Sequence, residues 1–227
     1  MDKRISESTV FESAEPELKN AASTTECESS QPNALSCKRI GYALCGSHCT
    51  VGRSLEIMAD IKSRGAIILP IISDSVAKTD TRFGRAAEIR KRIVKISGQE
   101  PIEDIRSAEP LGPKEPQDLM IVSPCTGNTL AKLAYGITDT PVTMAVKAHL
   151  RRSRPTLIAL ATNDALSANL KSLALLLERK GVFFVPLVQD DPIGKPHSLV
   201  ADFNLIPAAA EAALVGKQLR PLFLEKS

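Results

Sequence analysis

The sequence predicts an α/β fold with a mainly parallel sheet between two layers of helices. Short runs of β-branched and aliphatic residues alternate with segments whose apolar residues recur at helical spacing, which is the pattern of βαβ units. The strand-like runs are apolar nearly throughout, as expected of strands that helices cover on both faces. The predicted architecture is a Rossmann-like or flavodoxin-like three-layer sandwich.

The chain of 227 residues divides into an N-terminal extension and one α/β domain. Residues 1–38 contain seven acidic, four basic and ten Ser or Thr residues, with Phe11 as the only aromatic residue. Such a composition buries too little apolar surface to offset the loss of chain entropy, so the extension is predicted to be disordered. Residues 39–227 form the predicted domain.

The first half of the domain contains two strands and two helices. Pro70 favours an edge position for the second strand, because proline donates no ladder hydrogen bond. Gly65 supplies the stop signal of the first helix, and the second helix has a basic outer face. The expected elements are a strand at 40–45, a helix that ends at Arg64, a strand at 66–72, a helix at 82–97 and a connection rich in Pro and charge at 98–117.

The second half repeats the alternation of strands and helices. Asp139, Thr140 and Pro141 form a start signal for one of these helices. The expected elements are strands at 118–123, 156–161 and 183–187, helices at 127–134 and 142–150, a Leu-rich helix at 167–180, and a closing helix at 199–217 with a kink at Pro207.

Composition excludes several classes of protein. No run approaches the roughly 18 apolar residues that span a bilayer, and the N-terminus lacks the apolar segment of a secretory signal, so no membrane association is expected. Five cysteines without a CxxC spacing predict no metal site. With no Trp, two Tyr and six Phe, the chain has few stacking platforms, and no nucleic-acid partner is expected.

Small polar residues follow each predicted strand. Ligands of open α/β sheets bind at the carboxyl ends of the strands, where hydroxyls and helix N-termini favour anions. The GxGxxG and P-loop patterns are absent, so a mononucleotide phosphate, most simply that of flavin mononucleotide (FMN), is the expected guest. Ser and Thr at helix starts are also common N-caps, and that simpler interpretation stays open. The loops in question are Gly46-Ser47-His48-Cys49-Thr50, Ser73-Asp74-Ser75, residues 124–129 and Thr162-Asn163-Asp164.

Residues 123–139 carry a resemblance. The run Ser-Pro-Cys-Thr-Gly-Asn-Thr-Leu-Ala-Lys-Leu-Ala-Tyr-Gly-Ile-Thr-Asp resembles the flavoprotein family of flavin-containing cysteine decarboxylases, whose members share Pro-x-x-x-Asn-Thr-x-x-Lys-x-Ala-x-Gly-x-x-Asp. The similarity extends over about residues 38–219 and implies FMN as cofactor. By position it implies phosphate contacts at Gly46, Ser47, His48 and Ser73, flavin-ring contacts at Pro124, Thr126, Asn128 and Thr129, and a substrate-carboxylate contact at Asn163.

Further segments resemble one branch of that family. They are Thr79–Gly84, Ala108–Pro113, Ala148–Arg151, Thr162–Leu166 and Lys195–Ala201. This branch implies the B subunit of a two-subunit oxidoreductase, which acts with an A subunit that supplies the NADP site. The implied reaction oxidises a dihydro precursor from the lysine pathway to pyridine-2,6-dicarboxylate, in the cytoplasm of the mother cell of a sporulating bacterium. The implied assembly is a homo-oligomer that uses helix 167–180 or the helix around Val142, and activity of the isolated chain stays open.

The sequence also departs from the family pattern. Decarboxylase members place a catalytic His before the third strand, whereas this chain has Glu109 in that stretch and no His between His48 and His149. His48 and Glu109 are therefore the candidates for acid–base work. His149 is expected to complement a helix dipole, and Cys45, Cys49 and Cys125 are expected to be packing residues. An FMN-dependent decarboxylase or prenyltransferase, and a non-catalytic scaffold with a decayed flavin site, remain as alternatives.

Overall fold

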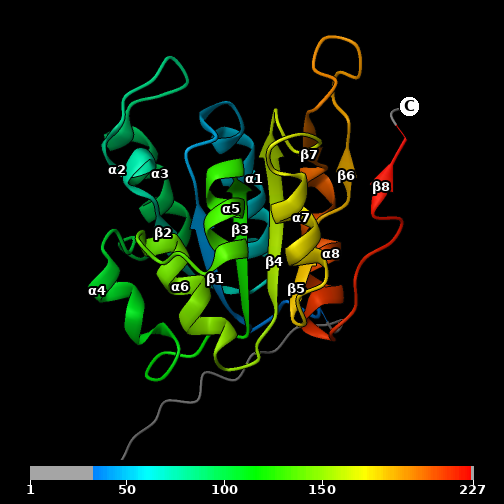
Figure 1. Cartoon of the computed structure of the whole chain (residues 1–227). Helices are drawn as coiled ribbons and strands as arrows, with labels where there is room; N and C mark the ends of the chain where they lie inside the picture. The colour runs from blue at the N-terminus through cyan, green and yellow to red at the C-terminus, as the bar shows by residue number, and fades with distance from the viewer. Residues whose placement is uncertain (1–32, 226–227) are drawn as a thin grey trace, which may run out of the picture.

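The computed structural model describes residues 33–225. Their sheet has eight strands in the order β2-β1-β3-β4-β7-β6-β8, and β5 pairs with β4 off this path (Figure 1). Four long parallel strands form its centre: β1 (Arg39–Leu44), β2 (Ile67–Ile72), β3 (Leu119–Cys125) and β4 (Thr156–Thr162). The predicted fold class and mainly parallel sheet are confirmed.

Short strands complete the sheet beyond β4. β5 (Val182–Phe184) runs parallel to β4, whereas β7 (Leu199–Ala201) is antiparallel both to β4 and to β6 (Leu187–Val188). β8 (Phe223–Leu224) pairs with β6 in parallel. At the opposite end β2 is the outer strand, as Pro70 predicts, and only an isolated bridge from Ile71 to Ile102 lies beyond it.

The helices cover both faces of the sheet. One face carries α1 (His48–Ser63), α3 (Ala86–Ser97) and α8 (Ile206–Leu214). The other carries α5 (Gly127–Tyr135), α6 (Pro141–Leu150) and α7 (Leu170–Leu177), which stand in front of the sheet in Figure 1. Four short helical turns join them: α2 (Asp74–Lys78), α4 (Ile105–Ala108), η1 (Glu109–Leu111) and η2 (Phe203–Leu205).

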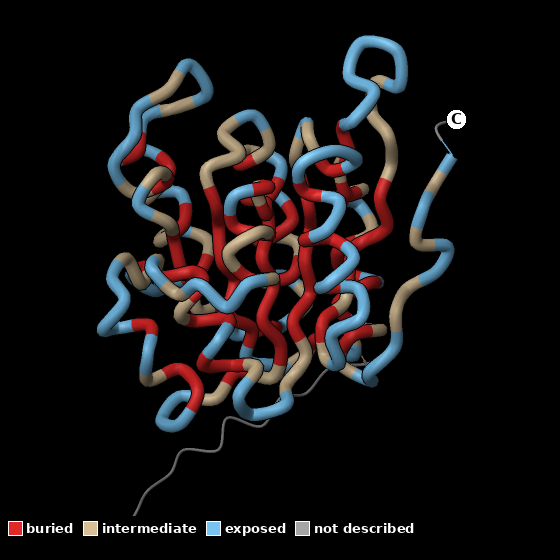
Figure 2. Tube along the Cα trace, in the orientation of Figure 1, coloured by how far each residue is buried: buried red, intermediate tan, exposed pale blue. Residues whose placement is uncertain are grey.

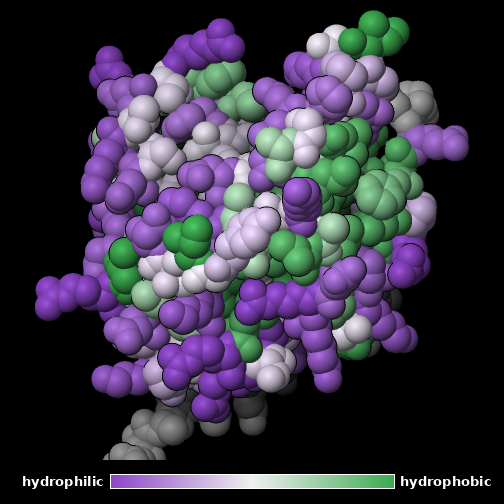
Figure 3. All heavy atoms as spheres, viewed as in Figure 1, coloured by the Kyte–Doolittle hydropathy of each residue, from purple (hydrophilic) through white to green (hydrophobic). Residues whose placement is uncertain are grey.

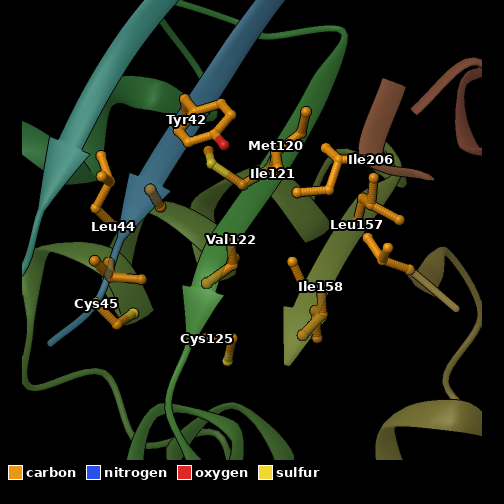
Figure 4. Close-up of a cluster of buried hydrophobic side chains, with 14 of the residues drawn as sticks. Tyr42, Leu44, Cys45, Met120, Ile121, Val122, Cys125, Leu157, Ile158 and Ile206 are labelled. Atoms are coloured by element: carbon orange, nitrogen blue, oxygen red, sulfur yellow. The ribbon is translucent and has the colours of Figure 1, made fainter. Parts of the chain in front are cut away.

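The core lies where the central strands meet the two helix layers. All seven residues of β3 are buried, because this strand has a parallel neighbour on each side and a helix layer on each face. Figure 2 shows the buried tube concentrated in the central strands, and Figure 4 shows Tyr42, Met120, Ile121 and Leu157 packed together there. Burial of such side chains is the main stabilising contribution to the fold.

Two predicted helices begin later than expected. The basic helix starts at Ala86, because residues 81–84 form a tight turn with Thr81 and Gly84 bridged to each other. Phe83 is therefore 52% exposed instead of buried on the helix. The Leu-rich helix starts at Leu170, after a series of turns from 163 to 169.

The predicted closing helix is wrong over its first seven residues. Leu199–Ala201 form β7, η2 follows, and α8 starts only at Ile206. Pro207 lies in the first turn of α8, where its missing N–H has no intrahelical partner to lose, so it begins the helix and does not kink it. The predicted strand at 183–187 is likewise two strands, β5 and β6, and the predicted connection 98–117 contains α4 and η1.

The folded part begins before residue 39. Leu35 is fully buried, and the amide Nδ2 of Asn33 donates to the Arg64 carbonyl at the end of α1 over 3.0 Å. Residues 33–38 therefore belong to the domain. The rest of the predicted extension, residues 1–32, lies outside the described residues.

Candidate functional site

The carboxyl ends of β1, β2 and β3 are held level with one another. Ser73 N donates to Leu44 O over 3.0 Å, and Cys45 N donates to Pro124 O over 3.2 Å, so hydrogen bonding continues into the loops after the strands. The loops that begin at Gly46, Ser73 and Thr126 consequently start along one edge of the sheet, the upper edge in Figure 1. This is the edge where ligands of open α/β sheets bind.

Ser47 and Ser73 stand at helix starts without capping them through their side chains. Each is the N-cap residue by position, of α1 and of α2, but neither hydroxyl accepts a hydrogen bond from the helix amides. Ser47 Oγ instead accepts from Thr50 Oγ1 over 2.9 Å, and Ser73 Oγ lies 3.0 Å from Ser75 Oγ. The simple capping interpretation therefore does not account for these two hydroxyls.

Thr126 is a true N-cap. Its Oγ1 accepts from Thr129 N over 3.2 Å, and the same atom donates to Thr129 Oγ1 over 3.1 Å. For Thr126 and Thr129 the capping interpretation explains the residue types, and the cap also fixes where α5 begins.

His48 lies beside Gly46 in the first loop. A Cβ atom built on Gly46 would come 3.5 Å from His48 Nε2 and 2.3 Å from Ser75 Oγ, so only glycine permits this approach of the first and second loops. Nδ1 of His48 is buried and has no hydrogen-bond partner among the described residues. A buried polar atom of this kind calls for a partner such as a water or a ligand oxygen.

Gly127 brings the loops after β3 and β4 together. A Cβ atom at this position would meet Asn169 Nδ2 at 2.6 Å, Thr162 Oγ1 at 2.7 Å and Asp164 Oδ1 at 2.9 Å. Asp164 Oδ1 accepts from Thr162 Oγ1, and from Asn169 Nδ2 over 2.9 Å. The two loops thus share one polar cluster at the backbone of the first residue of α5.

The structure separates the remaining candidates. Asn128 and Asn163 are exposed on the carboxyl edge, and Pro124 is buried at the end of β3. Glu109 is exposed on η1, which packs against α6 with α4, at the lower left of Figure 1 and away from the carboxyl-edge loops. Of the two acid–base candidates, only His48 lies at this edge.

Sequence reasoning placed Ser75 in the second loop without giving it a role of its own, and it missed Asn169. Ser75 contacts both Ser73 and Gly46, and Asn169 bonds the Asp164 carboxylate. Asn169 follows Asp164 by five residues, so the available signal was an amide side chain in the first turn of the predicted Leu-rich helix. For Ser75 the signal was a second hydroxyl two residues after the first.

Two of the three free thiols on or near this edge are packing residues. Cys45 and Cys125 are buried at the ends of β1 and β3 (Figure 4). Burial raises the pKa of Cys45 to about 11, and burial also raises the pKa of Cys125 well above its usual value. Such thiols stay protonated at neutral pH and are poor nucleophiles, as the packing interpretation expects. Cys49 is exposed.

A buried chain of hydroxyls supports the edge from beneath. Tyr42 OH donates to Ser54 O over 3.0 Å and lies 3.0 Å from Ser54 Oγ, which donates to Ser123 O over 2.6 Å. Burial raises the pKa of Tyr42 to about 12, so the phenol stays protonated. These contacts link β1, α1 and β3 immediately below the loops.

The predicted role of His149 is wrong. Its ring is 1% exposed, and its Nε2 lies 2.8 Å from the carbonyl of Pro155, across the turn from α6 to β4. Burial lowers the pKa of His149 to about 4, so at neutral pH it is uncharged and cannot complement a helix dipole with a positive charge. It is a buried hydrogen-bonding residue.

Comparison with known proteins shows which family the chain belongs to. The model of the flavoprotein family matches residues 28–203, which is more than half of the chain. The chain belongs to the flavoprotein family. Residues 33–225 contain no helix that is long and apolar enough to cross a membrane, and they bring together no group of three or more His, Cys, Asp or Glu side chains that could hold a metal ion.

Two relatives match this flavoprotein over nearly their full length. The B subunit of dipicolinate synthase from Bacillus subtilis (strain 168) is 45% identical over 193 residues, which are 85% of this chain and 96% of the relative. The crystal structure of the corresponding B subunit from Bacillus halodurans C is 39% identical, with a TM-score of 0.79 over 85% of this chain and 99% of that one. The FMN-dependent cysteine decarboxylase SpaF shares the fold, at 24% identity and a TM-score of 0.60 over 80% and 97% of the two chains.

Proposed function

We propose that the chain is the B subunit of a dipicolinate synthase, which acts with an A subunit to oxidise dihydrodipicolinate to dipicolinate. The observation that carries the proposal is the 45% identity to the B subunit of the Bacillus subtilis synthase across 96% of that protein. The reaction removes two electrons and two protons and leaves an aromatic ring with two carboxylates. The mother-cell cytoplasm of a sporulating bacterium is the setting that this function implies.

The carboxyl edge fits the phosphate of FMN. The hydroxyls of Ser47 and Ser73 accept no hydrogen bond from the helix amides, and the buried Nδ1 of His48 lacks a hydrogen-bond partner within the described part of the chain. Together with the backbone of Gly46 they would hold the phosphate at the positive end of α1. Pro124, Thr126, Asn128 and Thr129 would border the flavin ring. FMN would supply a two-electron acceptor, and NADP would bind to the A subunit.

The residues of this chain would bind and orient a dicarboxylate. Asn163 is exposed beside the Thr162, Asp164 and Asn169 cluster, which holds the backbone of its loop in place. Its amide would donate to one substrate carboxylate. Of the two acid–base candidates only His48 lies at this edge, and with Nδ1 directed to the phosphate its other ring nitrogen, Nε2, would receive a proton as the substrate ring becomes aromatic.

The open form of this edge supports a homo-oligomer. Asn128 and Asn163 are exposed, so a neighbouring chain would be needed to enclose a ligand there. Apolar side chains also gather on the outer surface over α7 (Figure 3), where Leu170 is 47% and Leu175 45% exposed. We place the contact between copies on the helix that the sequence marks as Leu-rich, because exposed patches of this kind mark interfaces.

Flavin titration of the purified chain tests the cofactor assignment. Stoichiometric binding of FMN, followed by absorbance and fluorescence, is expected, with an affinity about tenfold lower in Ser47→Ala and in Ser73→Ala, since each loses a hydrogen bond to a charged group. Ser63→Ala, at the far end of α1, is the matched control and should bind like the parent. A chain that rejects FMN supports the scaffold alternative and contradicts this assignment.

A further inference from the structure

A basic groove crosses the lower part of the face that α5, α6 and α7 cover. One hollow of about 900 Å³ lies among the ends of α6, α7 and α8 and the start of β5, and a second of about 330 Å³ lies between α5 and α6. Leu150 and Arg179 line both hollows, so the two hollows adjoin each other, and we call them together the basic groove. Arg154 and Lys180 lie just before β4 and β5, so the larger hollow opens at the amino edge of the sheet, opposite the candidate flavin site.

The lining of the basic groove carries seven cationic side chains and one acidic one, Glu178. Lys132 pairs with Asp139 at 2.9 Å, and Arg154 lies 3.8 Å from Asp118. The other five cations have no carboxylate partner within residues 33–225: Lys147, Arg151, Arg179, Lys180 and Arg220. The lining of the larger hollow also includes apolar side chains, among them Leu177 and Phe183. This surface suits an acidic polypeptide that also carries apolar side chains.

The chain itself has such a polypeptide. Residues 1–32 contain seven acidic and three basic residues, with Val10, Phe11 and Leu18 among them. The segment joins the fold at Asn33, which is bonded to the end of α1, and Cys37 N donates to Gly65 O over 2.9 Å at the same place. The end of α1 precedes β2, so the segment leaves from the amino edge of the sheet, where the basic groove opens.

We propose that residues 1–32 of the same chain lie along the basic groove. About 3.3 Å per residue gives an extended segment of this length a reach of roughly 100 Å, well beyond the roughly 40 Å diameter expected of a domain of this size. Each exposed ion pair contributes little, but the covalent tether gives the segment a high effective concentration at the groove. Docking through charge requires no regular secondary structure in the segment. The contact should weaken at high salt.

Zero-length cross-linking of the full chain tests this proposal. A carbodiimide joins carboxylates to lysine amines, so residues 1–32 should become linked to Lys147 and Lys180. Lys91 and Lys95, on the exposed basic face of α3, are matched controls on the other side of the sheet and should not react with the segment. Charge reversal by Arg179→Glu should lower the groove cross-links about tenfold, since like charges would then face each other.

Further variants and isotope labels show whether residues 1–32 of the same chain or of another copy occupy the basic groove. Arg220→Glu is a second reversal with the same expected loss, in case Arg179→Glu does not fold, and Arg92→Glu on α3 should leave the cross-links unchanged. Mixing isotopically light and heavy chains separates links within a chain from links between chains. Cross-links spread equally over Lys91, Lys95 and Lys180, cross-links insensitive to both reversals, or cross-links found only between copies would each overturn the proposal.

Discussion

Among single residues, His149 makes the stability of the fold depend on pH. Its folded pKa of about 4 lies below the ordinary value of 6.5, so between these limits the unfolded chain binds a proton that the folded chain excludes. Stability is therefore lost as pH falls below 6.5, by about 2 kcal/mol at pH 5, and the loss is complete below pH 4. The cause is burial of the imidazole in the last turn of α6.

The variant His149→Gln should lack this proton-linked loss. At pH 7 it should be less stable than the parent by about 1 kcal/mol, because the bond to Pro155 O is weakened. At pH 5 the difference should vanish or change sign. Urea denaturation of both chains at pH 7, 6 and 5 measures it. A difference that stays constant across this range would show that His149 titrates alike in the folded and unfolded chains.

Ser54 is the centre of the hydroxyl chain under the candidate site. Ser54→Ala removes the hydroxyl that donates to the Ser123 carbonyl and that lies beside Tyr42 OH, while the bond from Tyr42 OH to the Ser54 carbonyl remains, so the free energy of unfolding should fall by about 1–3 kcal/mol. Ser63→Ala, at the exposed end of the same helix, should change it by less than about 0.5 kcal/mol. Equal effects of the two substitutions in urea denaturation would contradict the structural role assigned to the network.

At the scale of elements, substitutions of two glycines distinguish the contribution of loop packing to stability from that of helix propensity. Gly127→Ala forces a Cβ into the Thr162, Asp164 and Asn169 cluster and should cost about 1–3 kcal/mol while weakening FMN binding. Gly52→Ala, inside α1 with no atom within 4 Å of the added carbon, should instead stabilise the chain by about 0.5–1 kcal/mol. Thermal denaturation compares them, and a stabilised Gly127→Ala would contradict the cluster described here.

The elements also show how far sequence patterns reach. Strands β1 to β4 and helices α5 and α6 were predictable, because they are apolar or amphipathic over their full length and are bounded by clear signals, such as Gly136 at the end of α5 and Pro141 at the start of α6. Strand β7 was not predictable, because three residues are too few to show the alternation of a strand. Residues Leu199 to Ala201 are equally compatible with a helix. What decides their conformation is pairing with β4 and β6, which is a long-range contact.

At the scale of the whole molecule, the two edges of the sheet differ in chemistry. The carboxyl edge gathers hydroxyls, amides and a histidine, whereas the amino edge opens onto the basic groove. The carboxyl-edge loops were predictable as a group, since the strand order of an α/β sheet brings them together. The exposed position of Glu109 away from that edge was not, because it depends on how the segment from 98 to 117 packs against α6.

The most direct test of the proposed function is reconstitution of the oxidation. The purified chain is mixed with FMN, the A subunit, dihydrodipicolinate and NADP, and formation of pyridine-2,6-dicarboxylate is followed by its absorbance. We expect product from the mixture at a rate that neither chain reaches alone, and a lower rate with Ser47→Ala than with Ser63→Ala. A rate in the mixture no higher than that of the A subunit alone would contradict the account, as would full turnover by this chain without its partner.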